Sequence, residues 1–275
     1  MLDTAAQHLC AGERPLPRDA QPLALGACDL GPGLHERYLV CEKTDGVWER
    51  LLGVPGAPDQ WWAVDRRGRV RELAEPPGDT SGGVTLVDAE TVGSAPPRVF
   101  AAHWVAGRDT RDLPTLEGLQ AAAAAGLSVK RMRPVSEARE LVGRMDAAGG
   151  GGHVLGDDPV DGLIFTPRES ATAGVLKWKF THTVDLLVDP AGSLLCGGPG
   201  GPLTLHGRAP PGTAPGVYEF DLDPETAQWR LLKPRPDKDR PNYVKVVVHT
   251  LEIMAQGVTL DRIADAGGGK NVPSS

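Results

Sequence analysis

The sequence predicts an α+β protein in which a mainly antiparallel sheet is followed by a small β-barrel. β-type runs follow one another between residues 37 and 106 with no helical segment between them, whereas helical periodicity is confined to residues 113–147. Short strands with turn signals then continue after residue 180. Because antiparallel neighbours need only short turns, these observations indicate two domains, residues 1–180 and 181–275.

Composition places the chain among ordinary globular proteins. It has 275 residues, 40% of them hydrophobic, and a formal net charge of −7. A negative chain has no overall basic field for nucleic acid, so any RNA contact must come from a local basic cluster. Four cysteines without paired spacing predict reduced thiols in an intracellular compartment. The chain lacks a long apolar run, which predicts no membrane insertion.

The first region is expected to contain a series of short strands. A hairpin is predicted around Arg66-Arg67-Gly68, because β-type runs flank this turn. The expected strands of this series are residues 37–40, 47–52, 60–65, 69–73, 84–90 and 98–104.

Two helices are expected between residues 113 and 147. Thr115 and Ser136 are the candidate N-caps, because each precedes a stretch of helical periodicity. The first helix is expected to bury the face formed by Leu116, Leu119, Ala122 and Ala123.

Strand patterns return at residues 161–165 and 174–179. Lys177 and Lys179 lie two residues apart, so their side chains share one face of a strand while Trp178 points to the other. One face of this strand is therefore cationic and the other apolar. Turn signals at residues 189–192 and 223–226 then divide the barrel region, and a helical tail follows.

The segment Glu42-Lys43-Thr44-Asp45-Gly46 lies between two of the expected strands. A lysine held in a cleft can act as a nucleophile, although Lys-x-Asp-Gly also occurs as an ordinary exposed turn. Other charged residues also lie at strand ends, and a cleft with cations and carboxylates suits a metal-bound nucleoside triphosphate. These residues are Lys43, Asp45, Arg66, Asp88, Glu90, Asp161, Lys177, Lys179, Arg235, Asp237 and Lys238.

Six segments in order resemble the motifs of mRNA capping enzyme guanylyltransferases, which belong to the covalent lysyl-nucleotidyltransferase superfamily with ATP-dependent DNA and RNA ligases. The lysine motif is shared across the superfamily, whereas the Leu-Lys-Trp-Lys strand and the Arg-x-Asp-Lys-x-x-Pro-Asn ending resemble the capping branch. The six segments are residues 42–46, 64–66, 86–92, 161–165, 176–179 and 235–242.

The resemblance implies a nucleotidyltransferase domain of the ligase or ATP-grasp-like type, followed by an OB-fold domain. In such enzymes a lysine attacks the α-phosphate of GTP, releases pyrophosphate and carries GMP as a phosphoramidate. The 5′-diphosphate end of an RNA then takes the GMP to form the cap. One covalent intermediate lets a single cleft serve two substrates in turn.

The resemblance also implies roles for individual residues. Lys43 resembles the nucleophile, and Asp161 resembles the carboxylate near the metal, which is expected to be Mg²⁺ or Mn²⁺. The expected GTP-binding residues are Arg66 and Glu90 near the sugar and α-phosphate, Lys177 and Lys179 on the α-phosphate, Arg235, Asp237 and Lys238 on the β- and γ-phosphates, Phe100 stacked on guanine and Lys130 at guanine O6. Phenylalanine on a strand is also a common core residue.

The expected partners follow from the same resemblance. They are GTP and a 5′-diphosphate RNA, with RNA triphosphatase and cap methyltransferase on separate chains and RNA polymerase as a candidate. The expected location is intracellular, in the nucleus or at a viral replication site.

Three residues depart from the family pattern. Trp48 and Lys233 each replace an arginine, and Ala101 replaces an aspartate. Lysine keeps the charge of arginine but loses its bidentate fork. Arg50 is a candidate to replace the guanidinium missing at position 48, because it lies on the same strand face. Two alternatives stay open: an ATP-dependent polynucleotide ligase, and an inactive homologue that binds RNA or a protein partner.

Overall fold

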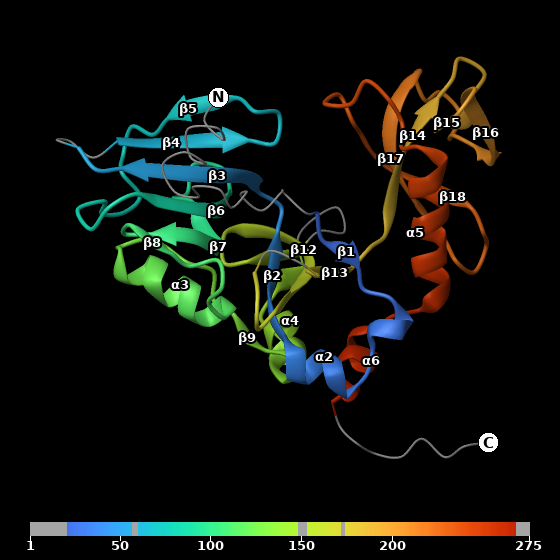
Figure 1. The fold of residues 1–275 in the computed structure, drawn as a ribbon. Helices are drawn as coiled ribbons and strands as arrows, with labels where there is room; N and C mark the ends of the chain where they lie inside the picture. The colour runs from blue at the N-terminus through green and yellow to red at the C-terminus, as the bar shows by residue number, and fades with distance from the viewer. Residues whose placement is uncertain (1–20, 57–59, 148–152, 172–173, 268–275) are drawn as a thin grey trace. The chain divides into compact units, whose positions relative to one another are not determined.

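The computed structural model describes residues 21–56, 60–147, 153–171 and 174–267, which form two compact units (Figure 1). Of these residues, unit 1 contains 21–24, 28–178 and 260–267, and unit 2 contains 25–27 and 179–259. Both units consist mostly of antiparallel strands with few helices, which confirms the mixed helix and sheet composition predicted from the sequence.

The first sheet of unit 1 has seven strands and carries Lys43. Its main path runs β1 (Leu23–Ala24), β13 (Leu176–Lys179), β12 (Asp158–Pro167), β11 (His153–Leu155) and β10 (Asp146–Ala147), and β2 (Tyr38–Thr44) pairs with β12 and with β9 (Arg133–Pro134). Lys43 on β2 lies opposite Gly162 on β12. The register shifts between Val160 and Gly162, so Asp161 is the extra residue of a β-bulge.

The second sheet of unit 1 has six strands, and each strand pairs antiparallel with its neighbours in the sheet. Its order is β5 (Val70–Glu72), β4 (Gln60–Asp65), β3 (Val47–Val54), β6 (Thr85–Thr91), β7 (Arg98–Val105) and β8 (Arg108–Asp109). One face buries Leu51, Trp61 and Val87 in a core shared with the helix α3 (Thr115–Ala124). Since side chains alternate along a strand, Trp48, Arg50 and Leu52 of β3 lie on the other face.

The helices of unit 1 correct three local predictions. Thr115 is not the N-cap of α3, because its hydroxyl donates to the carbonyl of Pro167 at 2.6 Å and Pro114 holds the cap position. Ser136 lies in the 3₁₀ turn Val135–Glu137, ahead of α4 (Ala138–Gly143). On α3 the expected apolar face is only partly buried, since Leu119 and Ala122 are buried whereas Leu116 and Ala123 are exposed. The remaining helical elements are η2 (Ala27–Asp29), α2 (Pro32–Arg37) and α6 (Leu260–Asp265).

Unit 2 is an antiparallel sheet with one long helix. The strand order is β16 (Gly201–Arg208), β15 (Ser193–Gly198), β14 (Thr183–Val188), β17 (Gly216–Leu222) and β18 (Trp229–Pro234). The helix α5 (Val244–Gln256) buries Val247 in a core with Leu186 and Phe220. None of the helices in the described ranges is long and apolar enough to cross a membrane.

The closed barrel expected after residue 180 is not present among the described residues. In the sheet of unit 2, the edge strands β16 and β18 lie at opposite ends of the strand order and do not pair with each other. Turn spacing predicted the strands themselves, and the turn before Ser193 forms as expected, with the Asp189 carboxylate accepting bonds from the Ala191 and Ser193 N–H groups. Closure depends on strand tilt and stagger, which turn spacing does not encode.

A buried ion network crosses the polar face of the second sheet. Arg50 Nε lies 2.8 Å from Asp88 Oδ1, and His103 Nε2 lies 2.9 Å from Asp88 Oδ2. All three side chains are buried. Burial raises the pKa of Asp88, but His103 and Arg50 outweigh it, so the pKa falls from 3.8 to about 2.

The substitution Asp88→Asn is expected to destabilise the protein by roughly 3–5 kcal/mol, because it leaves the buried Arg50 guanidinium without its counter-charge. The folded pKa of Asp88 lies below its ordinary value, so its contribution is present in full above about pH 4 and is lost as the pH falls toward 2. Urea unfolding at pH 7, 5 and 3 measures both effects. The exposed control Asp157→Asn is expected to change stability by less than about 0.5 kcal/mol. Equal stability of the two variants would contradict the network's role.

Candidate functional site

Lys43 and Asp161 form the centre of the candidate site. Lys43 Nζ lies 2.7 Å from Asp161 Oδ1, and the two side chains are 22% and 32% exposed. Lys43 comes from β2, and the bulge on β12 turns Asp161 toward it. An amine and a carboxylate are thus held together on neighbouring strands while both remain in contact with solvent.

The turn that follows Lys43 has no space for a side chain at position 46, where the sequence has glycine. A Cβ at position 46 would lie 2.6 Å from Glu90 Cγ and 2.8 Å from the Thr91 carbonyl, so a larger residue does not fit. The Gly46 N–H donates to Glu90 Oε1 at 3.3 Å, and the Thr44 hydroxyl donates to Glu90 Oε2. Glu90 therefore fixes the turn that follows the lysine strand.

Lys130 is buried beside the same carboxylate. Its Nζ donates to Glu90 Oε2 at 2.5 Å, to Thr44 Oγ1 at 2.8 Å and to the Glu42 carbonyl at 3.3 Å. Burial acts to lower the pKa of Lys130, but its acidic neighbours outweigh burial and raise it. Burial also raises the pKa of Cys41 to about 12, so this thiol is neutral and Glu90 is the main counter-charge. Contact of Lys130 with guanine O6 would require one of its three bonds to be exchanged.

Trp48 contacts two guanidinium groups. The Cζ atoms of Arg50 and Arg66 each lie 5.6 Å from the centroid of a Trp48 ring, which is within the range of a cation–π contact. Arg66 is exposed and follows β4, whereas Arg50 is buried and bound to Asp88. Arg50 is thus committed to the ion network, which argues against its replacing the guanidinium missing at position 48.

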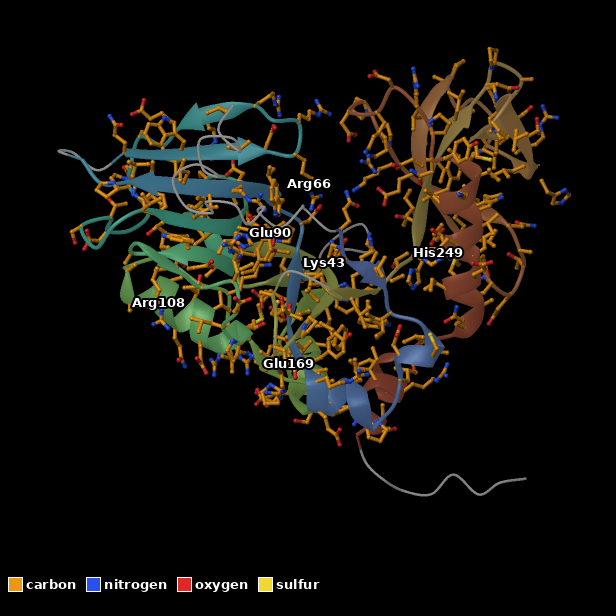
Figure 2. All side chains as sticks on the ribbon, viewed as in Figure 1. Lys43, Arg66, Glu90, Arg108, Glu169 and His249 are labelled. Atoms are coloured by element: carbon orange, nitrogen blue, oxygen red, sulfur yellow. The ribbon has the colours of Figure 1, made fainter. Side chains whose placement is uncertain are left out.

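Phe100, Lys177 and Lys179 lie on the same two sheets. Phe100 is half-buried at a second bulge, because Val99 and Ala101 face consecutive residues of β6. On β13 the predicted alternation is confirmed, with Trp178 buried and both Lys177 and Lys179 half-buried. β13 neighbours β12, the strand that carries Asp161. Figure 2 labels Lys43 on β2, Glu90 on β6 and Arg66 in the turn after β4.

In unit 2, Arg235 is held by carboxylates. Its Nε and Nη2 atoms form a bidentate pair with Asp237 at 3.0 and 2.9 Å, and its Nη1 lies 2.7 Å from Asp185. The hydrogen bond to Arg235 lowers the pKa of Asp237 to about 2. Lys238 is exposed, and its N–H donates to the Arg235 carbonyl. The Arg235 guanidinium would have to leave Asp237 before it could form a bidentate contact with a phosphate.

Lys233 lies at the position where the motif that this segment resembles has an arginine. It belongs to the same group of charged side chains as Arg235, because both approach Glu219. Its Nζ lies 3.3 Å from Glu219 Oε2. Asn242 fixes the end of the segment, accepting a bond from the Asp185 N–H at 2.8 Å.

Asp161 is the candidate carboxylate for a metal ion at this site. Within the described ranges, no group of three or more His, Cys, Asp or Glu side chains is placed to hold a metal ion. Mg²⁺ in nucleotide sites is bound by one or two carboxylates together with the substrate phosphates. Asp161 fits that requirement as a single half-exposed carboxylate.

Sequence reasoning missed the partners that fix the candidate site. Thr44 and Glu42 flank Lys43 and point to the other face of β2, where both are buried. Arg98 joins this region, with Nη2 at 2.5 Å from Asp158 and Nη1 at 3.9 Å from Glu42. The alternation of the strand could have indicated them, because it places Glu42 and Thr44 on the buried face, where a polar side chain requires a hydrogen-bond partner.

Comparison with known proteins leaves the resemblance as a prediction. No protein-family model matches the chain, and no curated protein sequence matches it.

The substitution Lys130→Met is expected to destabilise the protein by roughly 3 kcal/mol, because it leaves the partly buried Glu90 carboxylate without its ammonium. The midpoint of urea unfolding measures this change. Lys245→Met is the control, because Lys245 is exposed on α5. A Lys130→Met midpoint equal to that of the control would show that the ammonium does not hold the two sheets of unit 1 together.

Proposed function

We propose that the chain is an mRNA guanylyltransferase that transfers GMP from GTP to the 5′-diphosphate end of RNA. The ordered motifs around Lys43, Glu90, Asp161 and Lys177 support the proposal. The observation that carries it is the 2.7 Å approach of Lys43 Nζ to Asp161 Oδ1 at a half-exposed position. A nucleophilic lysine needs a held amine that a substrate can still reach.

The proposed reaction has two balanced steps. In the first, the Lys43 nitrogen bonds to the α-phosphorus of GTP, the bond to the β-phosphate oxygen breaks, and pyrophosphate and a proton leave. In the second, a terminal oxygen of the RNA 5′-diphosphate attacks the same phosphorus. The phosphorus–nitrogen bond breaks, and the lysine amine regains a proton as the capped RNA leaves.

Residues between positions 66 and 179 would bind and orient the nucleotide. Glu90 and Arg66 are proposed to contact the sugar and α-phosphate, and Lys177 and Lys179 the α-phosphate. Phe100 is proposed to stack on guanine. Such contacts act by position and charge, since phosphoryl-type transfer requires little other work from the protein.

Residues 235–238 of unit 2 are proposed to orient the β- and γ-phosphates through Arg235, Asp237 and Lys238. In this proposal unit 1 corresponds to the nucleotidyltransferase domain and unit 2 to an open, OB-like domain. Lys233 supplies charge where the family has arginine, but it cannot form a bidentate phosphate contact.

Asp161 is proposed to hold Mg²⁺ or Mn²⁺ together with phosphate oxygens. A bound divalent cation neutralises charge on the phosphates of the nucleotide. The Lys43 ammonium and this cation would compete for the same carboxylate, so Asp161 would release the ammonium as the nucleotide binds, and the ammonium would lose one proton to solvent to become the attacking amine.

The other capping activities are proposed to lie on separate chains. RNA triphosphatase would supply the diphosphate end, and a cap methyltransferase would act on the product. RNA polymerase is a candidate partner, and the proposed location is the nucleus or a viral replication site.

Incubation with α-labelled GTP and Mg²⁺, followed by denaturation, is expected to yield a labelled, acid-labile adduct. Lys43→Ala is expected to abolish the label, because no other amine carries the proposed bond. Lys245→Ala, at an exposed position on α5, is the matched control and should label like the wild type. Circular dichroism checks that both variants fold.

Two outcomes of this labelling experiment would contradict the proposal. Label from α-labelled ATP but not from GTP would favour the polynucleotide ligase. Equal absence of label in the wild type and in Lys43→Ala, with RNA still bound, would favour an inactive binding homologue.

A further inference from the structure

The turn between β4 and β5 concentrates positive charge in a negative protein. Residues 66–71, which we name the arginine hairpin, contain four arginines in six residues, whereas the whole chain carries a net charge of −7. All six residues are exposed. A local basic cluster of this kind is what a negative chain needs in order to contact nucleic acid.

Asp65 builds the turn that presents these arginines. Its Oδ1 atom accepts bonds from the N–H groups of Arg67 at 2.8 Å and Arg69 at 3.0 Å. The Asp65 carbonyl accepts the Gly68 N–H at 2.9 Å, and Gly68 adopts a φ of 73°, which favours glycine. Arg66 and Arg67 are therefore the two central residues of a fixed turn.

Arg69 and Arg71 each have a carboxylate partner. Arg69 Nε lies 2.6 Å from Asp65 Oδ2, and Arg71 forms a bidentate pair with Glu49 at 2.9 and 2.7 Å. The side chain of Arg67 makes no ion pair within the described ranges. The guanidinium of Arg67, at the tip of the hairpin, thus contributes positive charge that no carboxylate of the described residues offsets.

The hairpin lies on the same sheet face as part of the candidate site. Arg66 lies over Trp48, and Trp48 is the register partner of Glu90. Glu90 in turn contacts Thr44, the residue after Lys43. A continuous series of contacts therefore connects the lysine strand to the hairpin tip.

We propose that Arg67, at the tip of the arginine hairpin, binds a backbone phosphate of the RNA that accepts the nucleotide, an inference that rests on the proposed function. Guanidinium groups bind phosphate oxygens in a bidentate manner, and such contacts position a strand without reading its sequence. An exposed guanidinium in a fixed turn loses little conformational freedom on binding.

Trp48 is a positioning residue in this proposal. Its ring holds the Arg66 guanidinium toward the site, although it supplies no charge itself. The tryptophan that departs from the family pattern thus keeps an arginine in place from a neighbouring strand.

The test measures binding of a fluorescent 5′-diphosphate RNA oligomer to the full chain by anisotropy, without GTP and over a series of salt concentrations. Arg67→Glu is expected to weaken binding on the order of fivefold to tenfold and to reduce the salt slope by about 0.7 per lost phosphate contact. Arg108→Glu is the matched control. Arg108 is an exposed arginine on β8, the opposite edge strand of the same sheet (Figure 2).

Equal weakening by Arg67→Glu and Arg108→Glu would overturn the proposal, as would absence of RNA binding by the wild type. A polyglutamate peptide of matched charge is expected to bind at least tenfold more weakly than the RNA. Equal affinity for the peptide would assign the hairpin to an acidic protein instead.

The GTP adduct assay separates this inference from the proposed function. Normal adduct formation with unchanged RNA affinity in Arg67→Glu would reject the hairpin and leave the enzyme standing. Absence of the adduct in every variant, with RNA binding that still depends on Arg67, would support the hairpin and reject the enzyme.

Discussion

One buried ammonium joins the two sheets of unit 1. Lys130 contacts Glu90 from the second sheet and Thr44 and the Glu42 carbonyl from the first. Its own backbone N–H donates to the Val99 carbonyl on β7, so the lysine is fixed at both ends. Everything proposed for Lys43 depends on this junction, because Thr44 is the next residue on the same strand. A buried charge tolerates this location only while its partners are present.

Local patterns were sufficient to predict most strands. Residues Leu176–Lys179 alternate between apolar and cationic side chains, and a strand with one buried face requires that alternation. Helix caps were less predictable, because the Thr115 hydroxyl is bound by Pro167, a residue 52 positions away. Barrel closure could not be predicted from the sequence either, since it depends on whether two distant edge strands pair.

In the candidate site, too, some residues were predictable from the sequence whereas their contacts were not. Lys43 and Asp161 stood out as charged residues at strand ends, and the register of β2 with β12 brings them into contact. Lys130 was predicted as a site residue, but its bond to Glu90 was not, because the two residues lie 40 positions apart along the chain. Charge alone also suggested a role for Arg50 that its bond to Asp88 argues against. The sequence therefore identifies charged side chains that could bind a ligand. Whether a side chain is free to do so depends on the ion-pair partners that it meets in the folded protein.

The path of the chain has a practical consequence for anyone who shortens it. Residues 260–267 belong to unit 1, where the Ile263 side chain is fully buried and its carbonyl lies 2.9 Å from His35 Nε2. Unit 2 is therefore largely an insertion within unit 1 rather than an appendage at its end. A truncation after residue 178 would remove the helix α6 along with unit 2, so an isolated unit 1 would need residues 260–267 rejoined through a linker.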